Sequence, residues 1–176
     1  MVGLIAGRKA LPIALNAIAK SKHRDKVILN VIGEGPNTEQ SKALIERLGL
    51  NNVHWFGVRP NEETKREISK ADLLFFTSLL DATSTVIFEA LQANTPVMCH
   101  DTCGFGAVID ATCGIKIPLI NVSKSIKLFS QEIDKLIENP TKIEALKQGC
   151  RPKVEAYYWN EKGKKLYNIY KECLVK

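Results

Sequence analysis

Two carboxylates, Asp81 and Glu89, stand eight positions apart in this 176-residue sequence, a spacing that can place both at one ligand-binding pocket. The apolar run at 72–76 predicts a buried strand, and Asp81 lies on the loop that follows it. Ser84 and Thr85 can cap a helix that carries Glu89 roughly one and a half turns inside it. Both carboxylates would then face the same pocket, beside the free N–H groups at the start of the helix.

Thr83, Ser84 and Thr85 stand where this predicted helix begins. Free N–H groups at a helix start, together with hydroxyl donors, form a site for an anion such as phosphate. Plain capping of the helix by one hydroxyl is the alternative. Glu89 has apolar neighbours on both sides, and a carboxylate in that setting needs partners such as the two hydroxyls of a ribose. The alternative for Glu89 is the polar face of the helix, or a bond to a backbone amide.

The elements that position these residues follow an alternating pattern of strands and helices. This pattern predicts an α/β fold with a doubly wound, Rossmann-like parallel sheet and extra C-terminal helices. Strands are expected at 2–6, 27–32, 53–56, 72–76, 97–100 and 114–117, and helices at 11–20, 38–48, 61–69, 84–92, 123–138, 141–156 and 159–176. We expect an interruption of the 141–156 helix near Gly149 and Pro152. Tyr157, Tyr158 and Trp159 are expected to pack and to pin the last helices.

Further candidates lie at the carboxyl ends of the predicted strands, where open α/β sheets bind their ligands. Arg8 and Lys9 precede the first predicted helix and are either a solvated pair or cations for phosphate. Gly33 and Gly35 follow the second predicted strand. These glycines let the backbone approach a ligand closely, or they only form the turn.

The length predicts a single domain over 1–176, and the residue spacings and charge pattern predict no metal site and no nucleic-acid partner. The five cysteines match no zinc pattern and are expected to be free, mostly packed thiols. His23, His54 and His100 have no ligand spacing and are expected to be structural. The net charge of +6 is concentrated near the C-terminus. It indicates either a solvated helix face or attraction to the phosphates of a lipid carrier or membrane surface. The sequence has no basic stripe interleaved with aromatic residues of the kind found in nucleic-acid binders.

The segment 78–97 resembles the donor-site motif of the retaining family-four glycosyltransferases, which have the GT-B fold. That motif places seven residues between two carboxylates and ends in a "PV" strand, as Asp81, Glu89 and Pro96-Val97 do here. Further matches occur in the family's order at Gly33–Pro36, Asn52–Gly57, Cys103–Gly106 and Tyr158–Asn160. They cover only the C-terminal, donor-binding half of such an enzyme, so we expect the N-terminal acceptor domain to lie outside this chain.

The resemblance also implies roles for single residues. Glu89 would bind the ribose, Asp81 would lie near the donor sugar, and Lys9 would touch the diphosphate. The family's arginine has no clear counterpart, and Arg8 is the candidate to replace it. The implied catalytic residues are Asp81 and Lys9, and the implied binding residues are Arg8, Gly33, Gly35, Val58, Thr83, Ser84, Thr85 and Glu89. Asp81 is one methylene shorter than the Glu usual in the family.

The implied reaction transfers a sugar from a nucleotide-diphosphate sugar to a glycan or lipid-linked acceptor, with retention and without a metal or other cofactor. The acceptor would be held by the absent N-terminal half, onto which the family's last helix crosses back, so this chain alone should bind nucleotide but transfer little sugar. We expect a cytoplasmic location and association with the inner face of the cytoplasmic membrane. Two alternatives stay open: an epimerase or hydrolase of nucleotide sugars, and a doubly wound binding module without chemistry.

Overall fold

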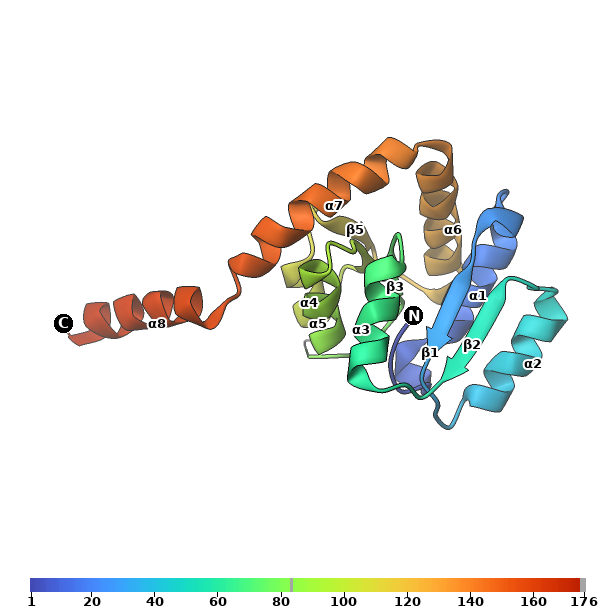
Figure 1. Ribbon diagram of the computed structural model, residues 1–176, viewed down its shortest axis with the longest axis horizontal. Coiled ribbons are helices and arrows are strands. Elements are labelled where there is room, and N and C mark those ends of the chain that lie inside the picture. The colour runs from blue at the N-terminus through green and yellow to red at the C-terminus, as the bar shows by residue number, and fades with distance from the viewer. Residues whose placement is uncertain (83, 175–176) are drawn as a thin grey trace.

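The computed structural model describes residues 1–82 and 84–174 and has parallel strands surrounded by helices (Figure 1). The strands are β1 (Leu29–Ile32), β2 (Val53–Gly57), β3 (Leu74–Phe76), β4 (Val97–His100) and β5 (Gly114–Ile117). They form two parallel sheets, β1-β2 and β3-β4-β5. The predicted α/β class with parallel strands is therefore confirmed.

Helices form two packed groups, one around α1 and one around α4. The helices are α1 (Leu11–Lys20), α2 (Thr38–Leu48), α3 (Asn61–Lys70), α4 (Thr85–Gln92), α5 (Cys103–Val108), α6 (Val122–Glu138), α7 (Pro140–Glu155) and α8 (Trp159–Leu174), with 3-10 turns η1 (Gly7–Lys9) and η2 (Arg24–Lys26). Helix α1 packs against α2 and α6, whereas α4 packs against α3 and α7. Helix α5 begins at Cys103 and contains the Cys103–Gly106 match.

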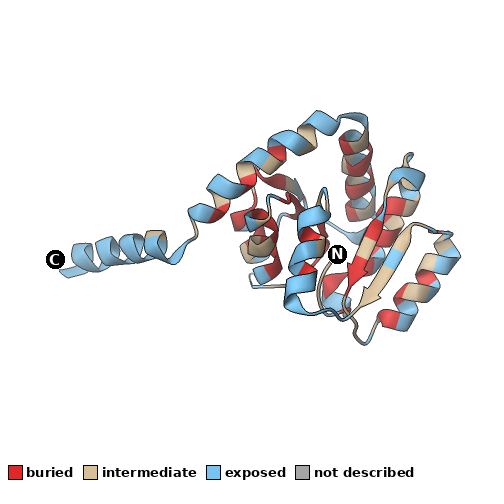
Figure 2. Ribbon diagram, in the orientation of Figure 1, coloured by how far each residue is buried: buried red, intermediate tan, exposed pale blue. Residues whose placement is uncertain are grey.

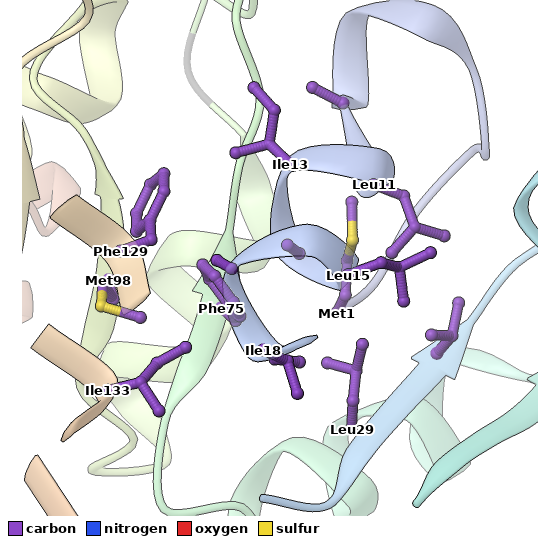
Figure 3. Close-up of a cluster of buried hydrophobic side chains, with 14 of the residues drawn as sticks. Met1, Leu11, Ile13, Leu15, Ile18, Leu29, Phe75, Met98, Phe129 and Ile133 are labelled. Atoms are coloured by element: carbon purple, nitrogen blue, oxygen red, sulfur yellow. The ribbon is translucent and has the colours of Figure 1, made fainter. Parts of the chain in front are cut away.

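Side chains that alternate along β3 enter two separate hydrophobic clusters. Phe75 joins the cluster that α1 and α6 cover (Figure 3), whereas Leu74 and Phe76 join the cluster beneath α4 and α7. In β4, Met98 lies with Phe75, and Val97 lies in the other cluster. Successive residues of a strand point to opposite faces, so both faces of this sheet are covered, as in a doubly wound fold.

The N-terminal segment differs from the sequence prediction. Residues 2–6 were expected to form a strand, but only an isolated bridge joins Val2 to Ile32. Gly3 has a φ of +129°, outside the strand region, and this interrupts regular pairing. Backbone bonds of 3.0 Å from Gly3 N to Ile32 O and from Ile5 N to Glu34 O still hold the segment beside β1.

Helix α7 is continuous, so the expected interruption is wrong. Gly149 lies inside the helix, where a side chain would not fit: a Cβ at this position would stand 1.9 Å from the carbonyl oxygen of Thr112. The glycine thus lets α7 approach that carbonyl closely. Pro152 is accommodated within the last part of the helix.

Helix α8 extends away from the rest of the chain and is exposed along its length (Figures 1 and 2). The prediction that Trp159 packs is wrong, because this residue is 85% exposed at the first position of α8. Tyr158 is also exposed. Tyr157 does pack, with its ring centroid 5.5 Å from that of Phe88 in α4. The chain turns at 156–158 and so directs α8 away from the core.

Candidate functional site

A cleft of about 540 Å³ lies where the N-terminal segment, the loop after β3 and the start of α4 meet. This volume falls within the range of small-molecule sites. The predicted residues that line it are Arg8, Lys9, Asp81, Ser84, Thr85 and Glu89. Its other lining residues are Val2, Gly3, Leu4, Arg59, Asn61, Thr64 and Val86. The structure thus brings together both carboxylates, both cations and the helix start in one cavity.

Asp81 is paired with two cations. Its Oδ1 lies 3.1 Å from Arg8 Nη1, and its Oδ2 accepts a hydrogen bond from Lys9 Nζ. The side chains of Lys9 and Asp81 are only 8% and 18% exposed. Burial of Asp81 works against its charge, but the hydrogen bond and charge of Lys9 and the charge of Arg8 outweigh it and lower the pKa of Asp81. The cluster keeps one positive charge in excess, which suits an anionic ligand.

The turn η1 positions the cations. Lys9 is its last residue, and Ala10 follows in the left-handed conformation with φ of +48° before α1 begins. The Lys9 ammonium stands 4.9 Å from the centroid of the Phe76 ring, the last residue of β3. The Phe76 ring and the Asp81 carboxylate therefore hold the Lys9 ammonium at the edge of the cleft.

Helix α4 presents the second carboxylate. Ser84 is the N-cap of α4, but its hydroxyl makes no capping bond. Glu89 is partly exposed and lines the cleft, whereas its neighbours Ile87 and Ala90 are buried. The described part of the chain offers the Glu89 carboxylate no hydrogen bond or ion pair. The two carboxylates therefore differ: Asp81 forms ion pairs with Arg8 and Lys9, whereas Glu89 accepts no hydrogen bond from residues 1–82 and 84–174 and so can accept from hydroxyl donors.

Gly33 and Gly35 do not line the cleft. A Cβ at Gly33 would stand 2.0 Å from the carbonyl oxygen of Gly3, and one at Gly35 would stand 2.4 Å from that of Ile5. The two glycines thus let their turn approach the N-terminal segment, which in turn borders the cleft. The structure therefore shows them as supports of the site; direct contact with a ligand stays a prediction.

Val58 is exposed and also lies outside the cleft lining, and Thr83 lies outside the described residues. The next residue, Arg59, does line the cleft. Its guanidinium is 3.7 Å from a Glu63 oxygen and its Cζ is 5.8 Å from the centroid of the Phe56 ring.

Arg59, Asn61 and Thr64 were not among the site residues that the sequence predicted. They follow β2 at its carboxyl end, and this position in the chain is the signal that could have identified them.

The histidines expected to be structural differ in their burial: His100 is packed in the interior, whereas His54 is exposed. His100 is buried, with its Nε2 3.0 Å from Ser125 Oγ, and burial lowers the pKa of its imidazole. All five cysteines are free, and Cys99, Cys113 and Cys150 are buried. Within residues 1–82 and 84–174, no group of three or more His, Cys, Asp or Glu side chains could hold a metal ion. No helix in the same ranges is long and apolar enough to cross a membrane.

The family described as "Glycosyl transferases group 1" matches residues 1–152. The chain therefore belongs to this family of glycosyltransferases. The match spans the N-terminal segment, both sheets and the whole of the cleft lining. The predicted resemblance to a GT-B donor-binding domain is thereby confirmed at the level of the family.

Individual relatives agree with this membership. The chain is 33% identical over 120 residues to the lipopolysaccharide glucosyltransferase WaaG of Escherichia coli. This alignment covers 66% of the chain and 31% of WaaG. The chain is also 26% identical over 145 residues to the 2-deoxystreptamine glucosyltransferase of Streptomyces kanamyceticus, covering 81% of this chain and 36% of that protein. The chain thus spans about a third of the length of these curated relatives.

Solved structures share the fold. The crystal structure of WaaG superposes with a TM-score of 0.77 at 28% identity, covering 87% of this chain and 41% of WaaG. The pneumococcal O-GlcNAc transferase GtfA, solved with UDP and GlcNAc, superposes with a TM-score of 0.83 at 15% identity, covering 99% of this chain and 35% of GtfA. At that identity the second match supports the fold alone.

Proposed function

We propose that this chain forms the donor site of a glycosyltransferase that moves a sugar from a nucleotide-diphosphate sugar to a glycan or lipid-linked acceptor. One observation carries the proposal: a single cleft is lined by Arg8 and Lys9, both paired with Asp81, by the start of α4 and by the carboxylate of Glu89. A diphosphate needs positive charge and N–H donors, and a ribose needs a hydroxyl acceptor. The cleft supplies both kinds of group.

The diphosphate occupies the side of the cleft where Arg8 and Lys9 meet the start of α4. Free N–H groups there, with the hydroxyls of Ser84 and Thr85, donate to phosphate oxygens. When the bond to the sugar breaks, the leaving diphosphate gains negative charge. Cations that are already held in place stabilise that charge without reorganising, which lowers the barrier.

Glu89 accepts hydrogen bonds from the ribose. It lies on the helix whose start receives the diphosphate, so phosphate and ribose bind along one element. The place of Glu89 in the cleft lining supports this role, because its partly exposed carboxylate accepts no hydrogen bond from the described residues and so has lone pairs for ribose hydroxyls.

Asp81 has a double task in this proposal. It holds Arg8 and Lys9 at the cleft, and one of its remaining lone pairs accepts a hydroxyl of the donor sugar. Its shorter side chain, compared with the family's usual Glu, accords with close pairing to the two cations.

Transfer itself depends on an acceptor site outside this chain, and the reaction proceeds with retention and without a metal. The relatives named as glucosyltransferases support transfer over epimerisation or hydrolysis. The UDP complex of GtfA makes UDP the first nucleotide to test. Membership of a family of glycosyltransferases disfavours a binding module without chemistry.

Calorimetric titration of the chain with UDP, GDP and ADP tests the proposal. We expect one of them to bind, and Glu89→Gln to weaken it at least about tenfold, since a hydrogen bond to a charged group contributes about 1.5–3 kcal/mol. Glu46→Gln is the matched control, because Glu46 is an exposed glutamate on α2, outside the cleft. Absence of binding by all three nucleotides, or equal effects of the two variants, would contradict the proposal.

A further inference from the structure

The buried hydroxyl of Thr77 bonds to the turn that carries the cations. Thr77 follows β3 and is fully buried. Its Oγ1 lies 3.0 Å from the carbonyl oxygen of Lys9 and 3.1 Å from that of Ala10. Thr77 does not line the cleft. Any effect of its hydroxyl on a ligand must therefore pass through the turn at 8–10.

The conformation of that turn needs external support. Ala10 adopts φ of +48° and ψ of 40°, a left-handed conformation that disfavours residues with a Cβ. Such a residue keeps this conformation only where its surroundings fix it. Ala10 is buried, and the hydroxyl of Thr77 bonds to its carbonyl.

The two residues after Thr77 continue the same contact. The amide N of Leu79 donates to the carbonyl oxygen of Arg8 across 2.8 Å. The Ser78 hydroxyl lies 3.3 Å from the same oxygen and 3.4 Å from Asp81 Oδ2. Three successive carbonyls of the basic turn, those of residues 8, 9 and 10, therefore accept from residues 77–79, which lead directly to Asp81. We call this set of bonds the 77–79 clamp.

We infer that Thr77 is a positioning residue for the donor site: its hydroxyl holds the turn at 8–10 so that Lys9 and Arg8 face Asp81 and the cleft. The inference rests on the proposed function, because it assigns the positioned cations to a nucleotide diphosphate. A misplaced charge binds phosphate less well even when the protein is folded.

A purely structural hydroxyl would behave differently, and Thr95 provides the comparison. Thr95 is also buried, and its Oγ1 donates to the carbonyl oxygen of Ile68 across 2.8 Å. It precedes β4 and does not line the cleft. Thr95→Val thus removes the same chemical group from a similar setting that has no connection to the cations.

The test compares Thr77→Val, Thr77→Ser and Thr95→Val by calorimetric titration with whichever of UDP, GDP and ADP binds the unaltered chain. We expect Thr77→Val to weaken binding about tenfold, Thr77→Ser to restore it to within about threefold, and Thr95→Val to leave it unchanged. Lys9→Met should weaken binding much less in the Thr77→Val background than in the unaltered chain, because Thr77→Val has already displaced the Lys9 ammonium. Unchanged affinity in Thr77→Val, or full additivity with Lys9→Met, would overturn the inference.

Failure of the proposed function gives a different result. If none of the three nucleotides binds the unaltered chain, the proposed function fails, and amide hydrogen exchange then tests the clamp by itself. Thr77→Val should speed exchange at the amide of Leu79, which bonds to Arg8, whereas Thr95→Val should not. Equal exchange at that amide in both variants would overturn the positioning role of Thr77.

Discussion

The Lys9 ammonium donates a hydrogen bond to the carboxylate of Asp81, although 72 positions separate the two residues in the sequence. The contact joins the turn before α1 to the loop that follows the carboxyl end of β3. Arg8 reaches the other oxygen of the same carboxylate. The protein's own carboxylate thus holds both cations in place, which favours binding of an anionic group without rearrangement.

Asp81→Asn tests how much this pairing contributes to stability. The change leaves the nearly buried Lys9 without its counter-ion, so we expect the free energy of unfolding to fall by about 1–3 kcal/mol. Urea denaturation at pH 7 measures it. Asp101→Asn removes an exposed ion pair with Lys116, and its effect should stay below about 1 kcal/mol. Equal effects of the two variants would show that the Asp81 pair is no stronger than a surface pair.

Lys9→Met separates nucleotide binding from folding. Methionine keeps the apolar stem beside Phe76 but removes the charge, so the fold should persist while nucleotide affinity falls about tenfold to a hundredfold. Calorimetry with the bound nucleotide measures the loss. Lys20→Met, an exposed lysine at the end of α1, is the control and should leave affinity within about twofold. A similar loss in both variants would indicate a general effect of charge.

Gly33→Ala tests the support of the N-terminal segment. The new Cβ would stand 2.0 Å from the carbonyl oxygen of Gly3, at a residue with φ of +132°. We expect the free energy of unfolding to fall by about 2 kcal/mol or more, because the backbone must shift. A Cβ at Gly7 meets no heavy atom within 4 Å, so Gly7→Ala should change stability by less than about 1 kcal/mol. Thermal or urea unfolding of both variants measures the loss of stability. Equal stability of the two variants would contradict the close approach of Gly33 to the Gly3 carbonyl.

The pH dependence of stability should include Asp110. Its side chain accepts from Lys153 Nζ across 2.7 Å and from Thr112, and these bonds hold the pKa of Asp110 well below its usual range. A lowered pKa means that the stabilisation is present above about pH 4, the pKa of an unfolded Asp, and is lost as pH falls through the lower folded value.

Asp110→Asn should therefore lower the urea midpoint at pH 7, and its difference from the unaltered chain should shrink towards pH 2. Asp25→Asn is the control, since the side chain of Asp25 is 96% exposed. A difference that stays constant from pH 7 to pH 2 would contradict the role of Asp110.

The sequence was sufficient to predict the strands β3 to β5, the helix α4 and the placement of Asp81 and Glu89 at one site. Those features follow from local patterns. Short apolar runs predict the strands, and segments with apolar residues at helical spacing predict the helices between them. The loops that follow parallel strands then lie at one edge of the sheet.

Other features depended on contacts between distant segments. The continuity of α7 follows from the close approach of Gly149 to Thr112, and the pairing of Asp81 with Arg8 depends on where two loops meet. The exposure of Trp159 likewise depends on the direction in which the chain leaves α7. None of these can be inferred from spacing within one segment.

A crystal structure of this chain with its bound nucleotide tests the central claim most directly. The account predicts ribose hydroxyl oxygens within hydrogen-bond distance of the Glu89 carboxylate, with the diphosphate beside Lys9 and the first turn of α4. A nucleotide bound outside this cleft, or one whose ribose makes no contact with Glu89, would contradict the account.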